Sequence, residues 1–213
     1  SVERDNLFVS DVIINGEYPH YAKRFFEENN IILKVEDGDM DWIKNNPIDY
    51  LAVSYYNTNA ETVTKDAEES NGNLFGGVRN PYLNQTDWGW QIDPHGMRIM
   101  LNDLAERYRI PLMIVENGIG ADDALIDGDT IQDDYRVSYL KEHIEQVNEA
   151  IKDGVEVVAY TMWSFTDIIS ASGGQMSKRY GLVYVDRDDD GNGTNRRFKK
   201  DSFYWYQKFL KNV

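Results

Sequence analysis

Three short apolar segments, separated by two longer amphipathic ones, constrain the fold of this chain more than any other feature. Residues 49–56, 111–116 and 155–165 are rich in apolar and β-branched side chains, which is typical of buried strands. Between them, residues 93–108 and 133–154 carry apolar side chains at helical spacing. Nearly continuous apolar strands that alternate with amphipathic helices predict a parallel sheet covered on its outer face by helices. The predicted fold class is therefore α/β.

Both predicted helices carry start or stop signals. Asp93 is suited to cap the first helix, and Pro94 suits its first turn. Apolar residues within 97–108 share one face of this helix. In the second helix, an apolar stripe within 137–151 is closed by Gly154, a residue suited to the left-handed conformation at a helix C-terminus. We therefore expect both helices to pack an apolar face on the sheet.

The pattern changes after the third predicted strand. Residues 181–198, "GLVYVDRDDDGNGTNRRF", indicate two short strands around a turn of Gly, Asn and Asp, which is typical of a β-hairpin. The following segment predicts a terminal helix with Asp201 as its cap. Its expected core side chains are Phe203, Tyr206, Phe209 and Leu210. No linker divides the chain, so residues 1–213 are expected to belong to a single domain.

Charge and composition exclude several classes of protein. The chain has 37 acidic and 22 basic residues, a net charge of −15 and a pI near 4.5, which would repel nucleic acids and anionic membranes. It has no cysteine, so disulfides and thiolate metal sites are excluded, and no apolar run reaches the roughly 18 residues of a membrane span. The chain opens with neither an initiator Met nor a signal peptide. We expect a cytoplasmic protein whose gene starts upstream of residue 1.

Two candidate ion sites are weak. Residues 186–191, "DRDDDG", follow the order of the first half of a calcium loop, but Arg197 occupies the twelfth position, where a bidentate Glu belongs. A solvated hairpin tip is the favoured interpretation. The three histidines, His20, His95 and His143, lie on predicted helices without the spacing of metal ligands. Neither a metal nor a cofactor is predicted.

The ends of the predicted strands are more informative. In a parallel α/β barrel the active site is built at the carboxyl ends of the strands, and here these positions hold Tyr55, Tyr56, Glu116, Asn117 and Trp163. A carboxylate for the anomeric carbon, a ring for the sugar face and polar groups for the hydroxyls suit a carbohydrate. Each residue alone could equally be a core aromatic or a capped acid, so the prediction depends on their conjunction.

The order of these motifs resembles glycoside hydrolase family 1. "IVENG" is preceded by "GWQIDPHGMRIMLNDLAERY" and followed by "DDYRVSYLKEHIEQVNEAIKDGVEVVAYTMWSFTDIIS" and "KRYGLVYVD". The resemblance spans nearly the whole chain and is to the C-terminal half of the family, whose members are retaining β-glycosidases on a (β/α)8 barrel. It implies that Glu116 is the catalytic nucleophile, that Tyr56 hydrogen-bonds it, and that Trp163 forms the aromatic floor under the glycone.

A second set of residues narrows the substrate that the resemblance implies. Ordinary β-glucosidases of the family carry Glu-Trp where this chain has Ser170 and Ala171, and loss of that carboxylate removes a charge that would repel a 6-phosphate. Lys178 and Tyr180 match the phosphate pocket of the 6-phospho-β-glycosidases, and lysine is a competent partner for a phosphate dianion. Ala171, where galactoside-preferring relatives tend to carry Trp, favours the 6-phosphoglucoside. The alternative is that Lys178 and Arg179 are only a basic pair at the start of a strand.

One expected partner of Glu116 is missing. A retaining glycosidase needs two carboxyl groups roughly 5–5.5 Å apart, and the family's acid/base lies in an Asn-Glu-Pro motif that these 213 residues do not contain. The three predicted barrel strands match, by the resemblance, the sixth to the eighth. The prediction is therefore a partial (β/α)8 TIM barrel: C-terminal strands six to eight with their helices plus a β-hairpin, with the acid/base in the absent N-terminal part.

The favoured function is retaining hydrolysis of 6-phospho-β-glucosides to glucose 6-phosphate and an aglycone or sugar, with the fragment itself inactive. A non-hydrolytic phosphosugar-binding module and an unphosphorylated β-glucosidase stay open as alternatives. The expected partners are the phosphorylated substrate and the missing half of the barrel. Because a partial barrel leaves inner layers and a strand edge uncovered, we expect the isolated chain to self-associate or to require its other half.

Overall fold

A parallel sheet lies at the centre of the protein, whose computed structural model describes residues 2–63, 69–70, 77–126, 129, 131–171 and 173–212. The elements run in the order α1 (Val2–Asn15), α2 (Ala22–Glu28), α3 (Asp39–Asn45), β1 (Leu51–Ser54), β2 (Glu69–Ser70), β3 (Gly77–Val78), α4 (Pro94–Tyr108), β4 (Leu112–Asn117), α5 (Asp134–Asp153), β5 (Val157–Met162), β6 (Val183–Val185), β7 (Arg197–Lys199) and α6 (Asp201–Leu210).

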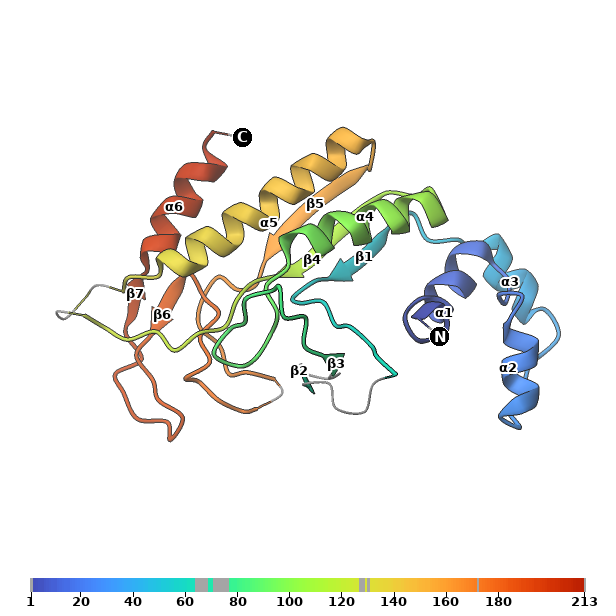
Figure 1. Ribbon diagram of the computed structural model, residues 1–213, viewed down its shortest axis with the longest axis horizontal. Helices are drawn as coiled ribbons and strands as arrows, with labels where there is room; N and C mark the ends of the chain where they lie inside the picture. Colours follow the sequence, from blue (N-terminus) through green and yellow to red (C-terminus); the bar gives the residue numbers. More distant parts are fainter. Residues whose placement is uncertain are drawn as a thin grey trace.

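Strands β1, β4 and β5 form the central sheet in that order, and both strand pairs are parallel. Helices α4 and α5 run along the same face of this sheet (Figure 1). The strand–helix–strand–helix–strand order and the parallel pairing confirm the α/β prediction. Helices α4 and α5 cover one face of the sheet and leave its other face open, as in part of a barrel.

The helix-covered face of the sheet holds the main hydrophobic core. Leu51 of β1 and Leu112 and Ile114 of β4 are buried there against Met97 and Leu101 of α4. Burial of each such side chain contributes roughly 1.5–3 kcal/mol. The alternate residues of β1 are exposed on the opposite face of the sheet. That open face is the one a complete barrel would close on its interior.

The predicted helix ends are correct for α4 and α5. The Asp93 side chain accepts a hydrogen bond from the Gly96 amide at 2.9 Å, and Pro94 is the first helical residue. Gly154 ends α5 with φ of +107°, a conformation that favours glycine. The prediction is wrong for one member of the apolar stripe of α5, because Ile151 is exposed.

The terminal helix differs from its prediction in two details. Asp201 is the first helical residue and not the cap, because Lys200 occupies the cap position. The buried carboxylate of Asp133 accepts from the Ser202 amide at 2.8 Å instead. The first turn of α6 is therefore capped by a residue that directly precedes α5. Leu210 is 57% exposed, whereas Phe203, Tyr206 and Phe209 pack against the core as predicted.

The predicted β-hairpin is confirmed. Strands β6 and β7 pair antiparallel, with Val183 opposite Lys199 and Val185 opposite Arg197. In the turn between them, Asp186 accepts from the Thr194 amide and Asp188 from the Asn192 amide. Within the part of the chain that the structure describes, no three His, Asp or Glu side chains gather as metal ligands would.

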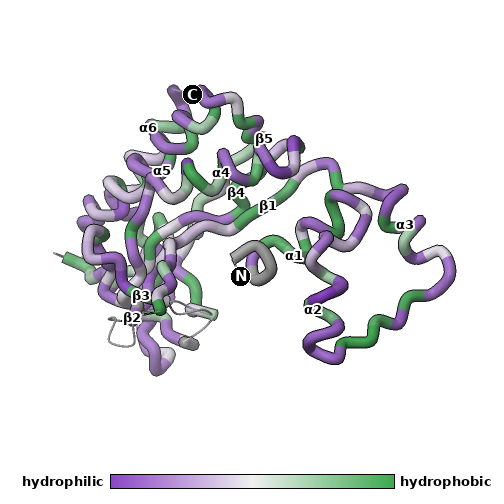
Figure 2. Tube along the Cα trace, turned by 45° about the vertical axis from the view of Figure 1, so that its right-hand side comes forward, coloured by the Kyte–Doolittle hydropathy of each residue, from purple (hydrophilic) through white to green (hydrophobic). Residues whose placement is uncertain are grey.

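Helices α1, α2 and α3 lie to one side of the sheet (Figure 1). Their attachment includes Asp11, a buried residue of α1 whose carboxylate accepts from the Arg107 guanidinium at 2.7 and 2.8 Å and from the Tyr108 hydroxyl at 2.9 Å. The connection between α2 and α3 is apolar over several residues and projects away from the sheet (Figure 2). Ile32, in this connection, is 91% exposed.

Among the residues described, the helices are too short or too polar for any of them to cross a membrane.

Candidate active site

An irregularity in β4 decides which way Glu116 faces. Val53 pairs with Ile114 but Ser54 pairs with Glu116, and the register against β5 shifts over the same residues. Val115 is therefore an extra residue in β4. Strict alternation would put Glu116 on the same face as Ile114, towards the helices, and the inserted residue reverses that parity. Glu116 consequently shares the open face of the sheet with its neighbour Ser54.

The hydroxyl of Thr161 stabilises this irregularity from the adjacent strand. It lies on β5 and donates towards the carbonyl oxygens of Ile114, at 3.2 Å, and of Val115. These carbonyl groups belong to the extra residue and to the residue before it. A side chain of β5 therefore contributes to the orientation of Glu116 on β4.

Tyr56 is the direct partner of the Glu116 carboxylate. Its hydroxyl donates to Glu116 Oε2 at 3.0 Å, while the Tyr55 amide donates to the Glu116 carbonyl at 2.8 Å. Burial, and then the hydrogen bond to Glu116, raise the pKa of Tyr56 well above its ordinary value. Tyr56 therefore stays a neutral donor, and the arrangement holds a partly exposed carboxylate in one orientation.

Two of the five strand-end residues do not face the site, which corrects the expectation that all converge on one face. Tyr55 is buried and donates to the Asp93 carbonyl at 2.6 Å. Asn117 is fully buried, donates to the Tyr55 carbonyl at 2.8 Å and accepts from Tyr160 at 2.6 Å. Both lie on the helix side because side chains alternate along a strand. Asn117 joins the ends of β1, β4 and β5 and does not line the open face.

Trp163 follows β5 directly and is tied to the end of β4. Its amide donates to the Asn117 carbonyl at 2.8 Å, and its peptide bond to Ser164 is cis. A Cβ atom added to Gly118 would lie 1.9 Å from the Trp163 carbonyl oxygen. Only glycine fits at this position, so the third residue of "ENG" is required by the close approach of Trp163.

The segment that carries Lys178 and Tyr180 lies between the ends of β4 and β5. Ala121 and Arg179 exchange backbone hydrogen bonds at 3.0 and 2.9 Å, and the Ser164 amide donates to the Tyr180 carbonyl at 3.2 Å. A Cβ added to Gly120 would touch both Lys178 and Tyr180 at 3.0 Å. The chain after Glu116 and the chain after Trp163 therefore both hold this segment.

A cluster of aromatic rings connects Lys178 with the Glu116–Tyr56 pair. Lys178 is only 3% exposed, and its ammonium nitrogen lies 3.9 Å from the centre of the Trp90 ring and 5.4 Å from that of Trp88. The Trp90 ring meets the Tyr56 ring edge-on, with 5.6 Å between their centres. Burial lowers the pKa of Lys178 to about 8. The cation of Lys178 is thus connected with the carboxylate of Glu116 through the rings of Trp90 and Tyr56.

Trp88 and Trp90 are site residues that our reading of the sequence did not assign. Both lie in "DWGW", a polar stretch just before α4. Two tryptophans in a short polar connection are the signal that could have found them, since an isolated loop has little core of its own to bury them. Their partners, Tyr56 and Lys178, come from distant parts of the chain.

Ser170 and Ala171 lie on a loop after β5. The Ser170 amide donates to the Gln175 carbonyl and the Gly174 amide to the Ser170 carbonyl, each at 2.8 Å, which closes the loop on itself. Ser170 is buried and Ala171 is exposed. The Trp90 ring also lies near the Tyr180 ring, with 6.4 Å between their centres, so Glu116, Tyr56, Lys178 and Tyr180 are joined through Trp90. Ser170 and Ala171 lie on the separate loop.

Beneath the site lies a buried group of charged residues. Arg136 donates to Asp133 at 2.8 Å and to Asp123 at 2.7 Å. Lys200 donates to Asp123 at 2.5 Å and to Asp167 at 2.8 Å. Burial by itself raises the pKa of Asp123, but the charges of Arg136 and Lys200 lower it overall. Each buried charge therefore has a counter-charge, as burial in a low-dielectric interior requires.

The Arg136 guanidinium also clamps the segment that carries Lys178. It donates to the carbonyl oxygens of Ile119 at 2.5 Å, Tyr180 at 3.2 Å and Arg179 at 3.3 Å. The Arg179 side chain contacts Asp167 at 3.2 Å, so this residue belongs to the buried group. The two members of the basic pair therefore differ, because Arg179 serves the interior and Lys178 faces the aromatic cluster.

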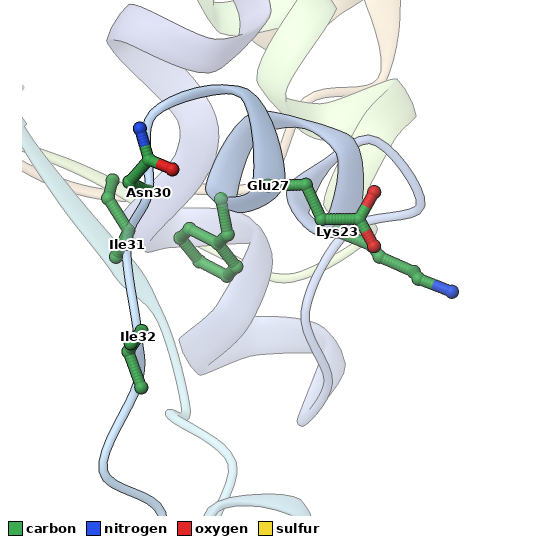
Figure 3. A pocket seen from close by; sticks show the side chains of 6 residues that line it. Lys23, Glu27, Asn30, Ile31 and Ile32 are labelled. Carbon is green, nitrogen blue, oxygen red and sulfur yellow. The ribbon is translucent and has the colours of Figure 1, made fainter.

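A hollow of about 410 Å³ lies elsewhere, between α2 and the connection that follows it. Figure 3 shows Asn30, Ile31 and Ile32 on one side of it and Lys23 on the other. Its lining is largely apolar and exposed, without the convergent polar groups of a specific ligand site. The strand ends, and not this hollow, combine the groups needed for chemistry.

Comparison with known proteins agrees with this geometry. The family described as glycosyl hydrolase family 1 matches residues 1–213. The chain belongs to this family. It is 52% identical over 209 residues to the aryl-phospho-β-D-glucosidase BglH of Bacillus subtilis, covering 98% of this chain and 45% of that protein. It is 49% identical over 214 residues to a 6-phospho-β-glucosidase of Clostridium longisporum, again covering 98% of this chain and 45% of the relative.

The solved structures place the chain in the same family. The family 1 β-glucosidase from Thermotoga maritima superposes with a TM-score of 0.78 at 32% identity, over 96% of this chain and 43% of that one. The chain thus spans about half the length of the relatives it matches. Its architecture is that of part of a TIM-barrel β-glucosidase.

Proposed function

We propose that this chain is the C-terminal part of a retaining 6-phospho-β-glucosidase. The observation that carries the proposal is the line of contacts from Glu116 through Tyr56 and Trp90 to the buried ammonium of Lys178. A nucleophilic carboxylate and a phosphate-binding cation at one site suit a phosphorylated glycoside. Relatives at about half identity are named as phospho-β-glucosidases, which supports the same substrate class.

In this proposal Glu116 attacks the anomeric carbon and forms a covalent glycosyl-enzyme, which water then hydrolyses. Tyr56 keeps the carboxylate in its attacking orientation by the hydrogen bond at 3.0 Å. Trp163 forms the floor under the sugar ring. Lys178, Tyr180 and Ser170 bind the 6-phosphate, and Ala171 leaves room beside it.

A second carboxyl group is needed to protonate the leaving oxygen and later to activate water, roughly 5–5.5 Å from the nucleophile. We propose that the rest of the barrel supplies it, with the present strands serving as the sixth to the eighth within one domain. The chain alone would then be inactive. Hydrolysis of a phosphorylated sugar suits the cytoplasm, where an uptake system that phosphorylates its cargo would deliver it.

An unphosphorylated β-glucoside is the second candidate substrate, favoured by the likeness to the Thermotoga maritima β-glucosidase. The ammonium group of Lys178, held in the aromatic cluster, supports the phosphorylated substrate instead, because lysine is a competent partner for a phosphate dianion. Activity on paired substrates with and without the phosphate separates the two candidates.

The proposal is tested by Glu116→Gly in the full-length protein. Turnover of an alkyl 6-phospho-β-glucoside should fall at least about 10⁴-fold, since the nucleophile is lost. Azide should restore cleavage of an activated aryl 6-phospho-β-glucoside by attacking from the vacated face, and the product should be the α-glycosyl azide. Tyr56→Phe is the matched control, because it weakens the site but leaves the nucleophile and gives no azide product. Near-normal turnover by Glu116→Gly would remove Glu116 from the mechanism.

A further inference from the structure

The acidic turn between β6 and β7 has one carboxylate that faces away from the turn. Asp186 and Asp188 accept hydrogen bonds from Thr194 and Asn192 and so close the turn on itself. Asp189 instead reaches the loop before the Lys178 segment. Its Oδ1 accepts from the amides of Met176 at 2.5 Å and Ser177 at 2.7 Å, and its Oδ2 accepts from the Ser177 hydroxyl at 2.7 Å.

Three hydrogen bonds to one ionised carboxylate form a strong anchor, because charge-assisted bonds are stronger than neutral ones. The Ser177 hydroxyl and then the backbone amides hold the pKa of Asp189 below its ordinary value. The anchored residues immediately precede Lys178. On the other side of Lys178, Arg179 is tied to Ala121 by two backbone hydrogen bonds. The backbone of Lys178 is thus held from both directions.

The attachment of the hairpin does not depend on Asp189 alone. The Arg179 guanidinium donates to the carbonyl oxygens of Val185 at 2.8 Å and Arg187 at 2.9 Å. Strand β6 is therefore held to the interior by a buried side chain, and the turn is closed by its own contacts. Loss of the Asp189 carboxylate would release Met176 and Ser177 while leaving the hairpin in place.

From these contacts we infer that Asp189 is a positioning residue, which orients Lys178 for the 6-phosphate by anchoring Met176 and Ser177. This inference rests on the proposed function, in which Lys178 binds the phosphate. It gives the acidic turn a role in substrate specificity that does not involve a bound ion. Asp189 itself does not touch the substrate.

The test compares four variants of the full-length protein: Asp189→Ala, Asp189→Asn, Ser177→Ala and Lys178→Ala. Each is assayed on an aryl β-glucoside with and without the 6-phosphate, at one ionic strength. Asp189→Ala should raise KM for the phosphorylated substrate about tenfold with little change in kcat, because it removes hydrogen bonds to a charged group. Asp189→Asn keeps an accepting oxygen, so its rise in KM should be smaller than that of Asp189→Ala. Ser177→Ala should raise KM for the phosphorylated substrate about threefold.

Asp190→Ala is the matched control, since it removes the same charge from the next residue of the turn, and both substrates should react as with the unaltered protein. The proposed function fails if Lys178→Ala lowers kcat/KM equally for both substrates, and the present inference fails with it. If Lys178→Ala is selective but Asp189→Ala is neutral, or affects both substrates equally, only the inference about Asp189 is overturned. If Asp189→Ala does not fold, Ser177→Ala decides: a selective rise in KM supports the inference, and an unchanged KM overturns it.

Discussion

Two regions of this chain differ in how far they bury their side chains. Around the strand ends, the fully buried Arg136 and Lys200 meet buried carboxylates, and the aromatic rings pack inwards. In the helical region 2–46, several large apolar side chains are exposed instead, and Trp42 is 70% exposed. The site region of this acid-rich chain therefore buries several basic side chains, whereas the helical region exposes large apolar ones.

The difference shows what a buried charge accomplishes here. Desolvation of an ion pair costs free energy, which is offset only by close counter-charges and additional hydrogen bonds. Arg136 satisfies this condition by donating to carboxylates and to three backbone carbonyls of the site. These hydrogen bonds fix the backbone around Lys178. In the helical region, the buried carboxylate of Asp11 also pairs with Arg107 of α4, whereas Ile32 and Trp42 are exposed.

The largest expected effect is the loss of Arg136. Arg136→Met should lower the free energy of unfolding of the full-length protein by about 3–5 kcal/mol, because Asp123 and Asp133 are left buried with too few counter-charges. Urea-induced unfolding measures it. Arg98→Met is the matched control, since Arg98 pairs with Asp153 at the surface, and its effect should be far smaller. If both variants lose the same free energy of unfolding, the buried charged group stabilises the protein no more than a surface ion pair does.

An intermediate effect is expected from pH. Because Lys178 has a pKa of about 8, it is charged below that pH and loses its proton above it. The phosphorylated substrate needs the charge, so kcat/KM for it, divided by kcat/KM for the unphosphorylated analogue, should fall about tenfold by pH 9. Lys178→Arg keeps its charge in this range and should remove the alkaline decline. A ratio that stays flat to pH 10 in the unaltered protein would contradict a cationic role for Lys178.

The smallest effect should come from the helical region. Ile32 is 91% exposed, and Ile32→Ala should change the free energy of unfolding by less than about 0.5 kcal/mol. The same change in the sheet, Ile114→Ala, removes a fully buried side chain and should cost about 2–5 kcal/mol. Denaturation of the two variants side by side measures the contrast. A loss above about 1 kcal/mol for Ile32→Ala would mean that another part of the protein covers this surface in solution.

The sequence by itself determined the central strands, the helices that cover them, the β-hairpin and the order of the residues that could carry the chemistry. Apolar runs and helical spacing are local patterns, so the parallel strands, the caps of α4 and α5 and the β-hairpin followed from short windows. Glu116 could be predicted as a site residue because it is an acid at the end of an apolar strand. The resemblance of "IVENG" and "SYYNT" to the family added the pairing of Glu116 with Tyr56, whose hydrogen bond the structure contains.

Only the tertiary structure decided which side chains meet. The extra residue Val115 turns Glu116 to the open face, and it is visible only in the pairing of β4 with its neighbours. The same alternation sends Asn117 to the helices, although it is adjacent in sequence. Trp90 and Asp189 reach Lys178 and its neighbours from other loops. Register and loop contacts depend on long-range packing, whereas periodicity is local, so a sequence pattern does not specify them.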